Sequence, residues 1–197
     1  MSKSQLHIHA IQMKVEPGVP DVNFARVAQR MEESMQAEQR PDVIVLPEMW
    51  NTGFALDRIG EQADSTGERT KYVMSAFSKK HQVNVIAGSV AVIEDSKIQN
   101  TAFVFNRSGE CIMDYSKIHL FRLMEEEKYL QGGNKLGLFE LDGVQAGIII
   151  CYDTRFPELS RQLALSGAKL MFVPAQWPHP RLHHWRTLLM ARALRIR

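Results

Sequence analysis

The stretch at residues 146–151 (AGIIIC) constrains the fold strongly, because every position in it is apolar or small. A strand that faces water on one side alternates apolar and polar residues, whereas a strand covered on both faces is a continuous apolar run. We therefore expect residues 146–151 to form a central strand, with helices over one face and a further layer over the other.

Similar β-rich runs alternate along the chain with segments whose apolar residues recur at helical spacing, a pattern typical of an α/β fold. The predicted helices span residues 21–39, with Asp21 as a capping residue, then 70–81, 157–168, and a last helix from about residue 184. The turn NRSGE at 106–110 predicts a hairpin. The remaining predicted strands are at residues 6–13, 42–48, 83–95, 100–117 and 168–176.

The charge balance excludes some classes of partner. The chain has 24 Lys and Arg against 22 Asp and Glu, a net charge of +2, which gives no reason to expect nucleic acid or an anionic membrane. The sequence has no apolar run of about 18 residues, and its first residues do not resemble a secretion signal. We therefore expect a cytoplasmic protein whose partners are small molecules or protein surfaces.

Cys151 lies where the predicted central strand ends, and Pro157 suits the first turn of the helix that follows. Such a connection would place the thiol in a crevice beyond the sheet edge, where a helix N-terminus favours the thiolate. A nucleophile is one interpretation, and a buried structural cysteine is the more common alternative. The other cysteine, Cys111, lies on a predicted hairpin strand, and we expect it to be of that structural kind.

A cysteine nucleophile needs a base and a group that stabilises an oxyanion. Glu48 follows a buried strand and Pro47, an unusual place for an unused carboxylate. Lys117 lies among apolar residues, where a desolvated, functional lysine is a candidate. A loop glutamate and a lysine that extends to solvent are the structural alternatives.

The segments LPEMWNTGF (46–54), SKIHLF (116–121) and ICYDTRFPE (150–158) carry the motifs, in the same order, of the nitrilase superfamily of carbon–nitrogen hydrolases. The chain resembles most the omega-amidase branch and its methionine-salvage amidase-like members. The resemblance implies an α/β fold, a four-layer α-β-β-α sandwich. It also implies Glu48 as general base, Lys117 as electrostatic stabiliser and Cys151 as nucleophile.

The resemblance implies further site residues. Glu126 would help to position Lys117 and the substrate, with Glu125 and Glu127 as alternatives. The backbone N–H of Tyr152 would share the oxyanion with Lys117.

Substrate contacts are expected from Arg155 and Trp177. Arg155 is also expected to brace its connection through carboxylates. Trp50, Phe54 and Trp177 lie near predicted strand ends, where they would line the acyl pocket or pack in the core.

The function implied is hydrolysis of the terminal amide of a small carboxylate-bearing substrate, such as a 2-oxo acid omega-amide, to acid and ammonia through a cysteine thioester. A nitrilase or another carbon–nitrogen hydrolase with the same residues is an alternative, as is an inactive remnant that only binds. No cofactor or metal is expected, and His179, His183 and His184 lack ligand spacing. The family implies a homo-oligomer, a dimer.

Residues 1–197 are expected to form a single carbon–nitrogen hydrolase domain that is incomplete at its C-terminus. The family's last helix has an Ala-Arg-Ala-x-Glu-Asn type sequence, whereas ARA at 191–193 is followed here by LRIR. The sandwich is therefore expected to lack its last strands and C-terminal segment, with an exposed sheet edge.

Overall fold

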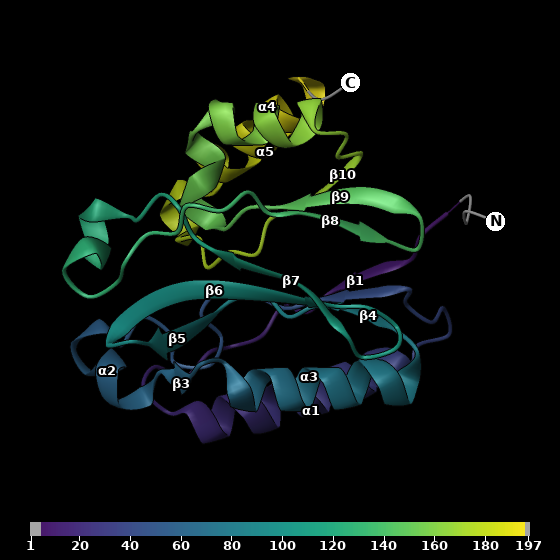
Figure 1. Ribbon diagram of the computed structural model, residues 1–197, viewed down its shortest axis with the longest axis horizontal. Helices are drawn as coiled ribbons and strands as arrows, with labels where there is room; N and C mark the ends of the chain where they lie inside the picture. Colours follow the sequence, from purple (N-terminus) through teal and green to yellow (C-terminus); the bar gives the residue numbers. More distant parts are fainter. Residues whose placement is uncertain (1–4, 196–197) are drawn as a thin grey trace.

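The computed structural model describes residues 5–195, which form four layers (Figure 1). Helices α1 (Pro20–Met35) and α3 (Glu68–His81) cover the outer face of a first sheet, and a second sheet packs against its inner face. Helices α4 (Pro157–Leu165) and α5 (Leu182–Arg195) lie outside the second sheet. The predicted α-β-β-α order of layers is confirmed.

The first sheet has seven strands in the order β1-β2-β4-β6-β5-β3, with β7 also paired to β6. Strands β1, β2 and β4 are parallel, and the long β6 runs antiparallel to β4, β5 and β7. The predicted hairpin at 106–110 joins β6 to β7. The strands are β1 (Ile8–Ala10), β2 (Val43–Val45), β3 (Asp64–Ser65), β4 (Asn84–Ile86), β5 (Val90–Glu94), β6 (Lys97–Phe105) and β7 (Cys111–Ser116).

The second sheet consists of β8 (Leu138–Leu141), β9 (Val144–Ile148) and β10 (Leu170–Phe172). Strand β9 lies in the middle, antiparallel to β8 and parallel to β10. Ile148 packs between the two sheets, whereas Ile149 packs on the α4 side. The expectation of an apolar segment covered on both faces is therefore confirmed.

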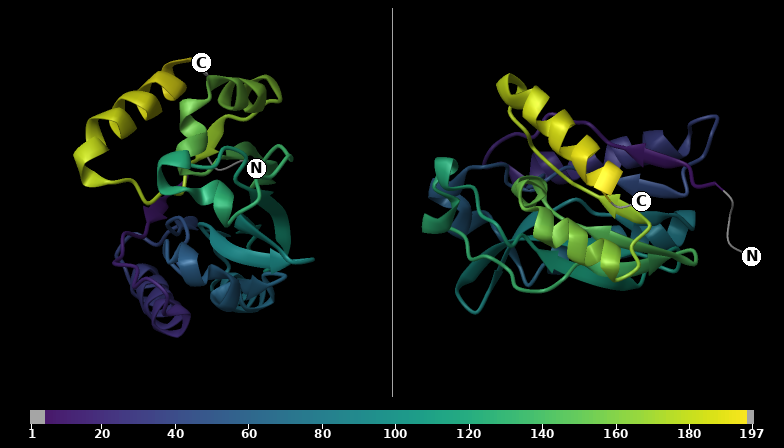
Figure 2. Two further views of the ribbon diagram at one scale, coloured as in Figure 1. Left: turned by 90° about the vertical axis from the view of Figure 1, so that its left-hand side faces the viewer. Right: turned by 90° about the horizontal axis from the view of Figure 1, so that it is seen from above.

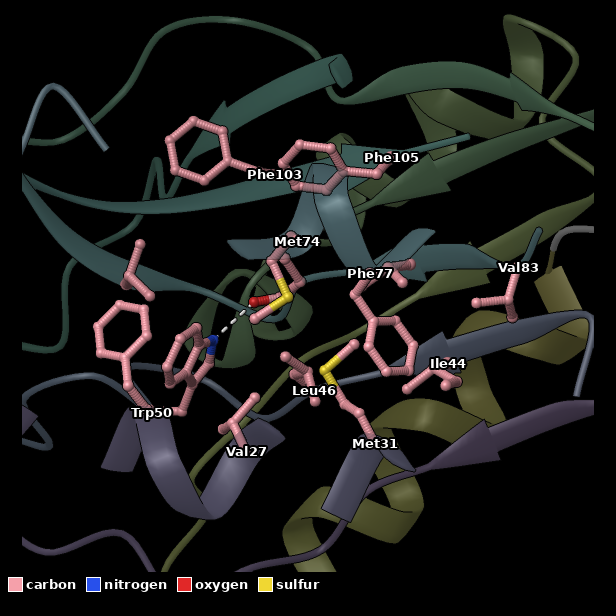
Figure 3. Close-up of a cluster of buried hydrophobic side chains, with 14 of the residues drawn as sticks. Val27, Met31, Ile44, Leu46, Trp50, Met74, Phe77, Val83, Phe103 and Phe105 are labelled. Atoms are coloured by element: carbon pink, nitrogen blue, oxygen red, sulfur yellow. Dashed lines mark hydrogen bonds between the residues drawn. The ribbon is translucent and has the colours of Figure 1, made fainter. Parts of the chain in front are cut away.

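Strict alternation along β6 builds two cores at once, because successive side chains of a strand point to opposite faces. Ala102 and Val104 belong to the core between the sheets, and Phe103 and Phe105 to the core under α1 and α3. Figure 3 shows this helix-side core, with Val27 and Met31 of α1 among its side chains.

Trp50 lies in the same core, fully buried, and donates its indole N–H to the carbonyl of Ala87 at 2.7 Å (Figure 3). A buried tryptophan needs such a partner for its one polar atom. Of the two alternatives that the sequence left open for Trp50, core packing is therefore the one observed.

The start of α1 differs from the prediction. Its N-cap is Val19, without a side-chain cap, and Pro20 occupies the first helical position. Proline suits that position because its missing N–H would have no partner in the helix. Asp21 lies in the first turn and pairs with Arg69 of α3 at 2.6 Å, so its prediction as the cap was wrong.

Helices α4 and α5 pack side by side over the second sheet (Figure 2). None of the helices within residues 5–195 has the length and apolar character that a membrane crossing needs. The short helical segments are η1 (Leu56–Arg58), α2 (Ile59–Gln62), η2 (Arg122–Met124), η3 (Glu126–Lys128), η4 (Cys151–Arg155) and η5 (His179–Arg181).

Gly88 allows the loop after β4 to approach the loop after β2 closely. Its φ is +59°, and a Cβ at this position would lie 2.0 Å from the carbonyl oxygen of Pro47. This close approach allows the N–H of Ser89 to donate to the carbonyl of Pro47 at 3.0 Å. The hydroxyl of Ser89 also accepts a hydrogen bond from the N–H of Met49 at 3.0 Å. The backbone on either side of Glu48 is fixed in this way.

We expect Gly88→Ala to destabilise the fold severely. Its matched control is Gly143→Ala, because Gly143 also has positive φ, +82°, but open space where a Cβ would stand. In the control, the free energy of unfolding should fall by only about 1–2 kcal/mol, the cost of placing a residue with a Cβ in the left-handed conformation. Gly88→Ala should lose several kcal/mol more, measured by urea unfolding. Equal losses in the two variants would contradict this role of Gly88.

Candidate active site

The carboxylate of Glu48 lies buried at the junction of the two sheets, a short distance along the chain from β2. Its side chain is fully buried, and each of its two carboxylate oxygens accepts one hydrogen bond besides the ion pair described next. Asn100 of β6 donates its side-chain N–H to Oε1 at 3.0 Å, and the backbone N–H of Gln176 donates to Oε2 at 2.9 Å. The side chain of Gln176 also donates to the Glu48 carbonyl at 2.6 Å, which fixes the backbone.

 Every oxygen atom of Glu48 therefore has a donor from a neighbouring element. The carboxylate is held in one orientation, as a group that reacts at a defined position must be.

Lys117 follows β7 directly and is 1% exposed, so the expectation of a desolvated lysine at this position is confirmed. Its Nζ lies 2.9 Å from Oε1 of Glu48 and 2.9 Å from Oε1 of Glu126. Burial alone would lower the pKa of Lys117, but the charges of Glu48, Cys151 and Glu126 outweigh it and raise that pKa above its usual value. The ammonium is therefore the stable form.

Glu126 lies in η3 and is the buried member of the acidic run at 125–127, with Glu125 and Glu127 exposed. Its Oε1 meets Lys117, and its Oε2 accepts the backbone N–H of Phe121 at 2.9 Å. Burial raises the pKa of Glu126, and the nearby charge of Glu48 adds to the increase, although Lys117 opposes both. Of the alternatives that the sequence left open, Glu126 is the one that reaches the lysine.

Cys151 follows β9 and begins η4 with a φ of 44°, a left-handed conformation that residues with a Cβ rarely adopt. Its N–H donates to the carbonyl of Pro174 at 2.9 Å, beyond the end of β10. Strain of this kind occurs often at functional sites and persists only where neighbouring contacts enforce it. The side chain is 8% exposed, at the wall of a pocket.

The environment of Cys151 favours the neutral thiol. Burial raises its pKa well above the usual value, the charge of Glu48 raises it further, and Lys117 only partly offsets the two. The expectation that a helix N-terminus would favour the thiolate was therefore wrong, because desolvation outweighs the effect of one short helical turn. A base must remove the proton before the sulfur can attack.

Asp153 fixes the connection that carries Cys151, a role that was not predicted from the sequence. It is fully buried, and its carboxylate accepts the Tyr115 hydroxyl at 2.7 Å and the backbone N–H groups of His119 and Ile150 at 2.8 and 3.0 Å. The ring Nδ1 of His119 lies 2.8 Å from the same carboxylate. The position of this aspartate, just after the continuous apolar run at 146–151, was the sequence signal that could have indicated its role.

Asn100 and Gln176, which hold Glu48, were also missed. Asn100 interrupts the apolar pattern of β6 and is fully buried, and Gln176 follows β10. A polar residue inside a buried strand needs a hydrogen-bond partner, so Asn100 carried a signal that the sequence alone could not connect to Glu48.

A pocket opens over the thiol, and its walls are largely aromatic. Of the residues expected around the substrate, Phe54, Tyr152, Arg155 and Trp177 line it, whereas Trp50 lies in the core. The full lining is Phe54, Lys117, Phe121, Met124, Glu126, Cys151, Tyr152, Arg155, Gln176, Trp177, Pro178 and Arg181.

Two expectations about nearby residues need correction. Arg155 contacts no carboxylate within residues 5–195, and its guanidinium lies over the rings of Tyr152 and Trp177 and beside His184, so the expected bracing through carboxylates was wrong. Cys111, expected to be buried, is exposed at the start of β7.

No group of three His, Cys, Asp or Glu residues in the described part of the chain could hold a metal ion.

The sequence and fold match known proteins. A family model described as carbon–nitrogen hydrolase matches residues 8–197, and the chain therefore belongs to the carbon–nitrogen hydrolase family. Saccharomyces cerevisiae Nit3, a member of the nitrilase superfamily, has a solved structure that superposes with a TM-score of 0.85 at 26% identity. The match covers 94% of this chain and 70% of that one.

Curated relatives are similar over most of this chain. The 2-oxoglutaramate amidase of Bacillus subtilis is 42% identical over 187 residues, which are 95% of this chain and 71% of the relative. The Omega-amidase YafV of Escherichia coli K12 is 40% identical over 154 residues, which are 78% of this chain and 57% of the relative. The aligned part thus spans between about half and three quarters of these relatives' lengths.

We expect Glu48→Gln to lower the pKa of Cys151. Removing the carboxylate charge takes away a group that disfavours the thiolate, while Lys117 continues to favour it, so the fall should be about one pH unit or more. The rate of alkylation of Cys151 by iodoacetamide, followed by mass across pH in a Cys111→Ser background, measures it. An unchanged or raised pKa in Glu48→Gln would contradict the proposed coupling.

Lys117→Met should destabilise the fold by about 3–5 kcal/mol, because it leaves two buried carboxylates without their cation. Adding Glu126→Gln removes one of those charges and should restore part of the loss, as measured by denaturant unfolding of the single and double variants. Additive losses in the double variant would show that the ion pairs are not the cause.

Proposed function

We propose that this chain is an amidase that hydrolyses the terminal amide of a small carboxylate-bearing substrate, such as a 2-oxo acid omega-amide, to the acid and ammonia. The observation that carries the proposal is that the thiol of Cys151, the carboxylate of Glu48 and the ammonium of Lys117 meet beside one pocket. Family membership and the names of two relatives, 2-oxoglutaramate amidase and Omega-amidase YafV, support an amide as substrate.

In the first step, the sulfur of Cys151 attacks the amide carbonyl carbon while Glu48 takes the thiol proton. The base is required because the folded environment keeps the thiol protonated. Glu48 then passes the proton to the amide nitrogen, the carbon–nitrogen bond breaks and ammonia leaves. The product of this step is an acyl thioester on Cys151.

In the second step, Glu48 takes a proton from a water molecule, and the water oxygen attacks the thioester carbonyl. The carbon–sulfur bond breaks, the proton returns to sulfur and the carboxylic acid leaves. The carboxylate of Glu48 thus serves first as a base and then as an acid. Its hydrogen bond with Lys117 keeps it in position for both roles.

The oxyanion of each tetrahedral intermediate accepts hydrogen bonds from Nζ of Lys117 and the backbone N–H of Tyr152. Donors that are in place before the charge develops contribute about 3–4 kcal/mol each in enzymes of this chemistry. Glu126 is a positioning residue in this scheme, since it holds the ammonium from the side opposite Glu48. Arg155 and Trp177, on the pocket wall, bind the rest of the substrate.

We further propose that residues 1–197 act as one carbon–nitrogen hydrolase domain, in the cytoplasm and as a dimer. Both cysteines are free thiols, which suits a reducing compartment. Light scattering on the purified protein tests the dimer.

Cys151→Ala should abolish ammonia release from a panel of amides, nitriles and carbamoyl compounds, because no other group can form the thioester. Glu48→Gln should lower the rate by roughly a thousandfold or more, since it removes both base and acid. Cys111→Ser is the control and should behave like the wild type, since Cys111 lies outside the pocket.

An acid quench during turnover should trap an acyl adduct, seen by intact mass in the wild type and absent in Cys151→Ala. Turnover by Cys151→Ala, or an adduct on Cys111, would refute the assignment. Release of ammonia from nitriles and not from amides would show that the substrate class is wrong.

A further inference from the structure

The pocket is lined by two guanidinium groups, Arg155 and Arg181, and the mechanism gives no role to Arg181. Arg155 is the last residue of η4, and Arg181 is the last residue of η5. The two arginines thus come from separate segments and line one pocket. Neither contacts a carboxylate within residues 5–195, in contrast to Arg69 and Arg107, which form ion pairs. The positive charge at the mouth is therefore uncompensated by the part of the protein described.

Arg181 is held in place by the pocket wall itself. Its backbone carbonyl accepts the indole N–H of Trp177 at 2.8 Å, and its guanidinium lies 5.7 Å from the centre of the Phe121 ring. Stacking on an aromatic ring leaves the N–H groups of an arginine free at its edge. The side chain is thus ordered by a ring while its donors remain available to a ligand.

The guanidinium of Arg155 is likewise held against aromatic rings of the pocket lining. Its guanidinium lies 5.7 Å from the Tyr152 ring centre and 5.4 Å from that of Trp177, and it is 3.3 Å from Nδ1 of His184. Burial, the neighbouring His183 and the charges of Arg155 and Arg181 together lower the pKa of His184. The charges of both arginines therefore reach His184, which lies next to Arg155.

At the inner end of the pocket the positive charge is compensated, because Lys117 forms ion pairs with two carboxylates. A ligand that spans the pocket would place an amide at Cys151 and an anion at the mouth, with a short apolar chain between the rings of Phe121 and Trp177. Arginine is suited to the anion because its planar fork matches a carboxylate.

We propose that Arg181, together with Arg155, forms a carboxylate subsite that selects monoamides of short dicarboxylic acids over neutral amides. The inference rests on the proposed amidase function and adds Arg181 as a specificity-determining residue. It assigns the two ends of the substrate to two ends of one pocket.

Binding to Cys151→Ala, which needs no turnover, tests the subsite by calorimetry. The probes are glutaramate and pentanamide, which differ by a carboxylate in place of a methyl group. Glutaramate should bind at least tenfold more tightly, and adding Arg181→Gln should remove roughly ten- to a hundredfold of that preference. Arg181→Lys should keep part of it, because the charge remains and the fork is lost.

Arg186→Gln is the matched control, since Arg186 lies further along α5, is exposed and does not line the pocket. It should leave both affinities unchanged, and Arg155→Gln provides a second variant should Arg181→Gln lower the thermal midpoint. Equal affinity for the two probes, or an equal loss for both in Arg181→Gln, would overturn the subsite. Absence of ammonia release by the wild type, with the binding preference intact, would refute the amidase function alone.

Discussion

The buried ion pairs of Lys117 with Glu48 and Glu126 are the interaction on which the rest of the site depends. Taking such charges out of water costs several kcal/mol per ion unless the remaining polar atoms are also satisfied. Asn100 of the first sheet and Gln176, next to the second, both donate to Glu48. The cluster is complete only when the two sheets are in contact, so the site and the sandwich stabilise each other.

The thiol side of the site depends on a backbone constraint. The left-handed conformation of Cys151 costs on the order of 1–3 kcal/mol and needs fixed neighbours on both sides. The carboxylate of Asp153 supplies one side by accepting the N–H of Ile150, and the carbonyl of Pro174 supplies the other by accepting the N–H of Cys151. Because Tyr115 of the first sheet also donates to Asp153, this constraint crosses the same sheet interface.

Local patterns in the sequence predicted the α/β class and a strand covered on both faces, whereas the four layers and the joint role of Glu48, Lys117 and Cys151 followed from the resemblance to the family. A continuous apolar run at 146–151 indicated a strand covered on both faces, and polar residues at strand ends indicated a site. The sequence could not predict the resting state of Cys151, which depends on how far burial and Glu48 outweigh a helix N-terminus. Nor could it predict the partners of Arg155, since those depend on which side chains of distant segments meet.

The ionic cluster also explains why a buried, protonated thiol is compatible with nucleophilic attack in the proposed mechanism. When Glu48 takes the proton of Cys151, one negative charge disappears from the carboxylate and one appears on sulfur, so the number of buried charges is unchanged. Lys117 lies close enough to interact with both groups before and after the transfer. Creating an isolated thiolate in this environment would cost far more, because desolvation would have no compensating partner. The cation between the two acids thus allows the proton to move without an additional charge being buried.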